Sequence, residues 1–418
     1  MPDNAKKEVK TAYHIVTAFF KWLVIAGFTG AIGGAVGSAF NISVEKATQL
    51  REIHPWLLFL LPVGGLLIAA IYHITKMENQ STNTIIDSVH LGEKVPVMLV
   101  PAIFLSTVVT HIVGGSAGRE GAALQIGGGI GGSVGYLFQL DEKDMRLATL
   151  CGMSAVFSAL FGTPLTAAIF ALEVISVGVF YYSGLLPCIV SAVTAYGVSL
   201  LFHIAPTHFS IGRFALTADG LWRVAVMAAV FAIMSAVFCV VMHGTDHIAE
   251  KFIKNRYARA AAGGVIVLGL TYFLGTTDYN GAGIGPITAA IEGGAAQPDA
   301  FLWKLLFTAI SLGFGFKGGE VVPTFFVGAT LGCALGHIMG VPAGFGAALG
   351  LVAVFCGAVN CPIASIVLSI ELFGSSNLIY FAVACGIAYM LSGYFGIYRS
   401  QKILYSKTRP EFINIQAK

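Results

Sequence analysis

Residues 155–165 read AVFSALFGTPL, and residues 353–363 read AVFCGAVNCPI. The second stretch lies 198 positions after the first, and the same offset places Glu371 opposite Glu173. A stretch that recurs at this distance predicts two homologous halves, although chance similarity between two apolar segments is an alternative.

A second pair of segments recurs at nearly the same distance. Gly118–Ala122 reads GREGA and lies 201 positions before Gly319–Pro323, which reads GEVVP. The offset also matches Gly127 with Gly328. Because the two offsets agree within three residues, we expect the halves to divide near residues 205–220.

The composition is that of a membrane protein. Of the 418 residues, 56% are hydrophobic and 11% are charged, whereas about a quarter of the residues of soluble proteins are charged. Several of the apolar stretches reach the roughly 20 residues that a helix needs to cross a bilayer. The stretches are residues 22–40, 56–72, 97–113, 122–139, 147–172, 179–203, 222–242, 259–275, 301–316, 321–339, 343–370 and 378–398. They are continuously apolar, which favours helices over the alternating pattern of a transmembrane β-barrel.

We therefore predict an all-α polytopic membrane protein in which some helices are tilted or broken by Gly and Pro. Many transporters consist of two inverted-topology repeats with an ion site at their interface. The predicted segments are an N-terminus at 1–12, a first membrane repeat at 13–210, a second repeat at 211–400 and a short tail at 401–418. Residues 274–299 are expected to form a re-entrant or surface connection.

Basic residues at both ends of the chain suggest its orientation. They are Lys6, Lys7, Lys10, Lys402, Lys407 and Arg409. Because basic flanks stay on the cytoplasmic side, we expect both termini to be cytoplasmic and the protein to lie in the plasma membrane. The seven cysteines lie mostly within apolar runs and are interpreted as small buried side chains. No metal, organic cofactor or nucleic-acid partner is predicted.

The stretch from Gly114 to Ala122 places two ionisable residues, Arg119 and Glu120, between apolar runs. Such residues at membrane depth are costly and suggest a functional site. The glycines open the backbone just before a helix, whose first N–H groups attract anions. A carboxylate beside such a helix start can occupy the position of an anion, and protonation would release it. The alternative is a structural Arg119–Glu120 contact.

The repeat makes Gly318–Pro323 the counterpart of this motif. It predicts a second helix start, at Val321, and a second buried acid, Glu320. Because burial favours the neutral form of a carboxyl group, Glu320 could exchange protons. The alternative is an acidic first-turn residue that stabilises its helix dipole.

Two further motifs carry hydrogen-bond donors. Ser81 and Thr82 lie at a predicted helix start and could bind an anion or cap the helix. The hydroxyl of Tyr398 could donate to an anion, or the ring could belong to an interfacial aromatic belt. Glu173 and Glu371 occupy matching helix positions, which favours a structural role for both.

Two short patterns resemble enzyme motifs without their context. Residues 114–118 fit G-x-S-x-G and residues 127–132 contain G-x-G-x-x-G. No preceding strand, catalytic Asp/His set or βαβ unit accompanies them, so neither a hydrolase nor a dinucleotide-binding protein is predicted.

Taken together, these motifs resemble the CLC family of chloride channels and proton-coupled anion antiporters. The family's G-[KR]-E-G-P motif matches Gly118–Ala122, with Ala122 in place of Pro, and implies that Glu120 is the gating residue. The G-x-F-x-P motif matches Gly319–Pro323, the pore tyrosine matches Tyr398, and the divergent serine loop corresponds to residues 80–84. The resemblance implies a homodimer in which each subunit has its own pore. The residues it places around the anion are Ser81, Thr82, Gly118, Arg119, Gly121, Val321, Val322 and Tyr398.

One difference from the G-x-F-x-P motif helps to distinguish the branches of this family. Glu320 and Val321 resemble the bacterial fluoride/proton antiporter branch, which is thought to use the acid corresponding to Glu320. Val174 stands where chloride/proton antiporters carry an internal proton glutamate. Ser81 is the chloride-like residue, since the fluoride branch usually has Met there. On balance the resemblance favours fluoride export coupled to protons, with Glu120 and Glu320 in gating and proton transfer. A chloride/proton antiporter and a passive chloride channel remain the alternatives.

Overall fold

The computed structural model describes residues 3–92 and 94–418. Residues 1–2, the start of the predicted N-terminal segment, lie outside the described residues. The first half of the chain forms α1 (Asp3–Ile53), α2 (Leu61–Ile74), α3 (Thr82–Leu91), α4 (Leu99–Val113), α5 (Glu120–Leu137), α6 (Glu142–Phe161), α7 (Pro164–Glu173) and α8 (Leu185–Leu201). The second half forms α9 (Ala218–Phe252), α10 (Arg256–Leu274), α11 (Ile284–Glu292), α12 (Ala300–Gly313), α13 (Val321–Met339), α14 (Ala343–Val359), α15 (Pro362–Phe373) and α16 (Leu378–Leu391).

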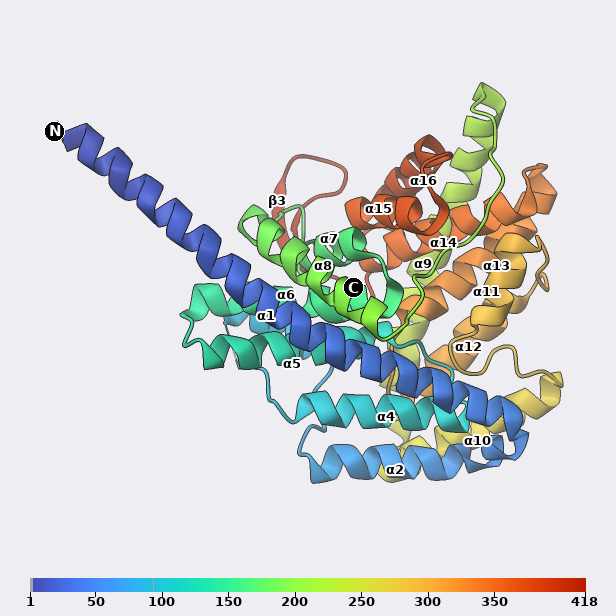
Figure 1. The fold of residues 1–418 in the computed structure, drawn as a ribbon. Helices are drawn as coiled ribbons and strands as arrows, with labels where there is room; N and C mark the ends of the chain where they lie inside the picture. The colour runs from blue at the N-terminus through green and yellow to red at the C-terminus, as the bar shows by residue number, and fades with distance from the viewer. Residues whose placement is uncertain (1–2, 93) are drawn as a thin grey trace.

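The helices confirm a polytopic all-α membrane protein. Among the described residues, seven helical segments are long and apolar enough to cross a membrane. Helix α1 has 51 residues and is about 75 Å long at 1.5 Å per residue, far more than the roughly 30 Å hydrocarbon core. Figure 1 shows its N-terminal part projecting away from the helical body. Large apolar side chains such as Leu201 and Phe273 are exposed on the outer helices, where lipid would cover them.

The internal repeat is present in the helix boundaries. Helices α5 and α13 begin 201 residues apart, and α7 and α15 begin 198 residues apart. The turns before α7 and α15 also correspond, because Gly162 and Asn360 both have positive φ angles, 68° and 59°. The two halves therefore build the same local structures at the offsets found in the sequence.

Small residues hold equivalent helix pairs together in the two halves. Helix α5 packs on α6, and α13 packs on α14. A Cβ atom on Gly127 would overlap the backbone carbonyl of Gly152, and one on Gly328 would overlap that of Gly350. Close backbone approach of this kind drives helix association in lipid, where apolar burial adds little.

Two parts of the chain contain secondary structure that the sequence did not predict. The stretch 274–299 is not only a connection, because it contains helix α11; positive-φ glycines at Gly283 and Gly294 flank this helix and gave the segment a loop-like composition. The tail forms strands β2 (Lys402–Tyr405) and β3 (Phe412–Gln416), which join β1 (Ser176–Val177) in a small sheet.

The sheet pairs segments that are remote in sequence. Strand β1 runs parallel to β2, with Ser176 opposite Lys402, and β2 runs antiparallel to β3. A two-residue strand has no periodicity from which it could be predicted. The seven cysteines are free and buried, which confirms their interpretation as small core residues.

Candidate ion site between the two repeats

The two glycine-rich motifs cross each other as an antiparallel bridge. The N–H of Gly118 donates to the carbonyl of Gly319 over 2.7 Å, and the N–H of Gly319 donates to the carbonyl of Gly118 over 2.8 Å. The pairing brings the N-termini of α5 and α13 together. Since the first N–H groups of a helix have no partner within the helix, two sets of free donors converge here.

The carboxylate of Glu120 occupies this junction. Its side chain is completely buried. Its Oε2 atom accepts hydrogen bonds from the N–H of Arg119 at 2.9 Å and from the N–H of Val322 at 3.3 Å. Its Oε1 atom has no hydrogen-bond partner among the described residues. One carboxylate oxygen is thus bound to backbone amides of both repeats, while the other is unsatisfied.

Glu320 lies directly across the junction. It is the residue before the first turn of α13. Its Oε2 atom is buried and lacks a hydrogen-bond partner among the described residues, and a Cβ atom added to Gly121 would lie 3.0 Å from it. The second acid therefore packs against the first turn of α5, beside Glu120.

The N-terminus of α3 contacts the same turn. The Thr82 hydroxyl donates to the carbonyl of Gly121 over 3.4 Å and accepts from the Gln125 side-chain amide over 3.2 Å. Ser81 precedes α3, and its N–H donates to the hydroxyl of Thr84 over 3.2 Å. Gln125 was not predicted, although an amide side chain in the first turns of the apolar run 122–139 is a signal for it.

Tyr398 is held between α3 and the end of α14. Its side chain is buried, and its hydroxyl has no hydrogen-bond partner among the described residues. The N–H of Ile397 donates to the carbonyl of Ala358 over 2.9 Å, and the N–H of Ser400 donates to the Asn83 side chain over 3.1 Å. The loop that carries Tyr398 is thus attached to the helix that begins at Thr82.

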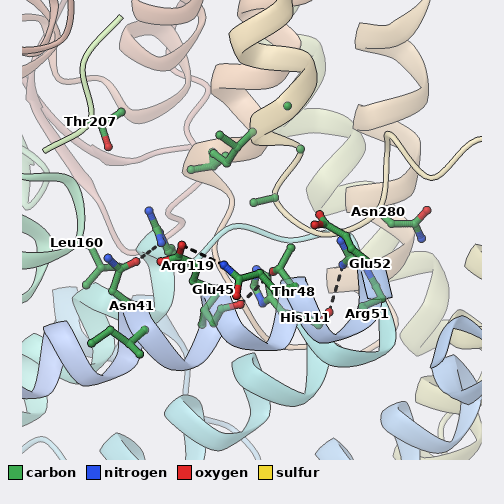
Figure 2. A pocket seen from close by; sticks show the side chains of 18 of the residues that line it. Asn41, Glu45, Thr48, Arg51, Glu52, His111, Arg119, Leu160, Thr207 and Asn280 are labelled. Carbon is green, nitrogen blue, oxygen red and sulfur yellow. Dashed lines mark hydrogen bonds between the residues drawn. The ribbon is translucent and has the colours of Figure 1, made fainter. Parts of the chain in front are cut away.

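The Arg119 side chain extends from the junction to α1. Its guanidinium donates to the Asn41 side chain on α1 and lies 3.9 Å from the Oε1 atom of Glu120. It lines a vestibule of about 860 Å³, which Figure 2 shows along one face of α1. Val322 also borders this vestibule, so the hollow reaches the junction from one side.

This arrangement can bind an anion and exchange a proton. The amides that hold Glu120 are the donors that would hold an anion, because both ligands are negative and seek the same N–H groups. Among the described residues, no three His, Cys, Asp or Glu side chains are grouped as metal ligands.

Residues 64–393 match the sequence profile of the family described as voltage gated chloride channel. The chain belongs to this family, the CLC proteins. It is 40% identical over 398 residues to a chloride/fluoride channel protein of Pseudomonas syringae pv. tomato, a match that covers 93% of this chain and 87% of that protein. It is 24% identical over 406 residues to an H⁺/Cl⁻ exchange transporter of Yersinia pestis, covering 90% of this chain and 85% of that one.

Solved CLC structures have the same fold. A CLC-type fluoride/proton antiporter matches with a TM-score of 0.89 and 30% identity, and the match covers 92% of this chain and 98% of that chain. A slow cyanobacterial Cl⁻/H⁺ antiporter matches with a TM-score of 0.77 and 21% identity, covering 89% of this chain and 94% of that chain. The all-α CLC fold predicted from the motifs is confirmed.

Two further acids of this CLC chain form a reciprocal structural contact. The Glu173 carboxylate accepts from the first-turn N–H groups of Ile363 at 3.1 Å and Ala364 at 2.8 Å on α15. The Glu371 carboxylate accepts from Leu165 at 3.0 Å and Thr166 on α7. The glutamate near the C-terminal end of α7 thus caps the N-terminus of α15, and the one on α15 caps the N-terminus of α7. These contacts agree with the structural role expected for both glutamates.

Proposed function

We propose that this CLC protein exports fluoride in exchange for protons. The observation that carries the proposal is the Glu120 carboxylate bound to a backbone amide of the opposite repeat, with Glu320 packed against the same turn. The relatives support it, since one is named a chloride/fluoride channel protein and one solved structure is a fluoride/proton antiporter.

In the proposed cycle Glu120 and the anion alternate at one place. As a carboxylate, Glu120 holds the N–H groups of Arg119 and Val322 and blocks the path. A proton on its unsatisfied Oε1 atom removes the charge, and the neutral group then binds these amides less strongly. The anion then accepts hydrogen bonds from the N–H groups that Glu120 has left. Glu320 transfers the proton toward the other side of the membrane.

The remaining predicted residues complete this proposal. Backbone groups of Gly118, Gly121, Val321 and Val322 shape the position of the anion, and Ser81, Thr82 and Tyr398 offer hydroxyl donors near it. Arg119 acts from the vestibule, where its charge attracts anions toward the junction. These assignments follow from where the side chains lie and from the resemblance of the motifs.

The test is ion flux from proteoliposomes, measured with a fluoride electrode and a pH-sensitive dye. We expect an inward proton gradient to drive fluoride uphill. Glu120→Gln removes the titratable charge with little change in shape, so it should abolish proton movement. Glu411→Gln is the matched control, because Glu411 is an exposed acid in the C-terminal tail that does not line the vestibule. Its coupling should equal that of the wild type.

A chloride/proton antiporter is the second candidate, because Ser81, just before α3, is the residue that the family resemblance associates with chloride. Comparing chloride and fluoride efflux at equal concentration decides between them. Chloride moving as fast as fluoride would contradict the fluoride assignment. Anion efflux that no pH gradient can drive uphill would instead identify a passive channel.

We further propose a homodimer in the plasma membrane with both termini on the cytoplasmic side. Exposed apolar side chains on α8 and α15, such as Val193 and Ile363, offer a surface that a second subunit or lipid would cover. The mass of the detergent-solubilised particle decides the oligomeric state. Labelling of an Arg409→Cys variant by a membrane-impermeant thiol reagent, from the inside only, would support the orientation.

A further inference from the structure

A second hollow lies across the membrane from the vestibule. Helices α2 and α10 run antiparallel, since Gly65 packs on Ala260 while Gly264 packs on Leu61. Both belong to segments long enough to span a bilayer. The vestibule borders the chain just before α2 and just after α10, whereas a smaller cleft of about 70 Å³ lies at the C-terminal end of α2 and the start of α10. The two hollows therefore open on opposite faces.

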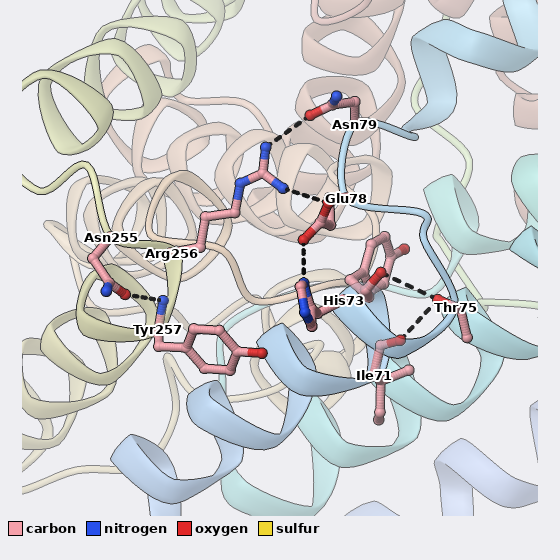
Figure 3. Close-up of polar contacts among 9 residues, drawn as sticks. Ile71, His73, Thr75, Glu78, Asn79, Asn255, Arg256 and Tyr257 are labelled. Carbon is pink, nitrogen blue, oxygen red and sulfur yellow. Dashed lines mark hydrogen bonds and ion pairs between the residues drawn. The ribbon is translucent and has the colours of Figure 1, made fainter.

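The cleft carries an excess of positive charge. Its lining includes three basic side chains, Lys317, Arg256 and Arg259, and one acid, Glu78. Glu78 already has two partners, because one oxygen lies 2.7 Å from the His73 ring and the other lies 3.3 Å from Arg256, as Figure 3 shows. Arg259 likewise lies 3.8 Å from Glu250, so Lys317 is the cation of this lining that has no ion pair among the described residues. Its charge would attract an anion.

Two donors at the cleft lack protein acceptors. Tyr72 is only 4% exposed, and its hydroxyl has no hydrogen-bond partner among the described residues. The Lys317 ammonium lies 4.4 Å from the centre of the Tyr72 ring and forms no ion pair within the described residues. A buried hydroxyl is normally satisfied, so an unpartnered one on a residue that lines the cleft is a donor available to a ligand.

The cleft is also connected to the junction by the chain itself. Lys317 precedes Glu320 by three residues in the loop that leads into α13. The N–H of Lys317 donates to the Thr110 hydroxyl on α4 over 3.3 Å, which fixes the start of this loop. An ion bound beside Lys317 would therefore lie next to the segment that carries the second acid.

We propose that this cleft is an anion-binding site in which a small inorganic anion is held by Lys317 and the Tyr72 hydroxyl before it reaches the junction. The cleft of about 70 Å³ has room for a small inorganic anion together with water. This proposal rests on the proposed function in one respect, because the anion bound at the cleft is taken to be the anion that the protein transports.

The test is sided transport by the full chain in oriented proteoliposomes, with fluoride supplied to one face at a time. Lys317→Met and Tyr72→Phe should each raise the KM for fluoride about tenfold on the cleft side, since each removes a donor to an anion. The KM on the vestibule side should not change. Lys76→Met is the control, because it removes an exposed cation near the end of α2 that does not line the cleft.

A third variant should change the KM in the opposite direction. Glu78→Gln removes the one acid of the cleft and should lower the KM on that side. Unchanged KM values in Lys317→Met and Tyr72→Phe, or equal shifts on both faces, would overturn the site. If the wild type shows no proton coupling, the proposed antiport is wrong. A KM shift confined to the cleft side would still support the anion-binding site. If the wild type carries chloride instead, the same variants are measured with chloride.

Discussion

Glu120 and Glu173 show how the partners of a buried carboxylate determine its role. Both oxygens of Glu173 accept backbone N–H groups of α15, whereas Glu120 has one oxygen without a partner. A fully satisfied carboxylate is held in place as a helix cap, while a partly satisfied one can gain a proton and leave. The resemblance to the CLC family placed no proton-carrying acid at Val174, and the contacts of its neighbour Glu173 are consistent with that.

Glu173→Gln is expected to destabilise the protein without changing transport coupling. The amide can accept only through its oxygen, and its NH₂ group would face a backbone N–H. The loss should be about 1–2 kcal/mol, seen as a lower apparent midpoint of thermal unfolding in detergent. Glu371→Gln should also destabilise the protein, but with a smaller loss of unfolding free energy, because Glu371 is partly exposed. A changed ratio of protons to anions in Glu173→Gln would contradict the structural role.

At the scale of elements, the helix pairs α5–α6 and α13–α14 orient the starts of α5 and α13. Their glycines let the backbones touch at Gly127 and Gly152 in one half and at Gly328 and Gly350 in the other. Because Glu120 begins α5 and Glu320 immediately precedes α13, a shift of either helix moves the N–H groups that face these acids. The packing glycines therefore affect the site although they lie away from it.

Gly127→Ala should therefore reduce both stability and transport. The new Cβ atom would overlap the Gly152 carbonyl, and backbone atoms cannot give way as a side chain can. Overpacking of this kind costs about 1–3 kcal/mol. Gly269→Ala on α10 is the control, since nothing lies within 4 Å of its new Cβ atom. The control should match or exceed the wild type in thermal stability, and equal transport by both variants would disprove the packing argument.

At the scale of the whole molecule, the segment after Tyr398 joins the two repeats. The buried Gln401 side-chain amide donates to the carbonyl of Val174 over 2.9 Å in the first half and to that of Val359 over 2.8 Å in the second. Its oxygen accepts from the Asn360 side chain over 2.8 Å. Three hydrogen bonds thus anchor the loop that positions Tyr398.

Gln401→Leu should loosen this junction of the repeats. It removes the donor to the Val174 carbonyl and one of the partners of Val359 and Asn360, which keep the Cys361 thiol and the Phe395 carbonyl. A buried group left unsatisfied costs about 1–3 kcal/mol. We expect a lower apparent unfolding midpoint and slower anion flux, because Tyr398 loses its support. Arg409→Gln, an exposed change in the same tail, should leave both unchanged. Wild-type flux in a destabilised Gln401→Leu would show that the loop does not depend on this anchor.

The sequence by itself determined the membrane class, the repeat offsets and the positions of Glu120 and Glu320 at two helix starts. Run length and composition are local properties, and the repeat offsets need only a comparison of two stretches of the same sequence. The tertiary structure alone decided that Glu120 binds the amide of Val322, that Arg119 turns to Asn41, and that Gln125 and Tyr72 contribute polar groups. These contacts join residues that lie far apart in the chain, and helix packing rather than any local pattern brings them within hydrogen-bonding distance.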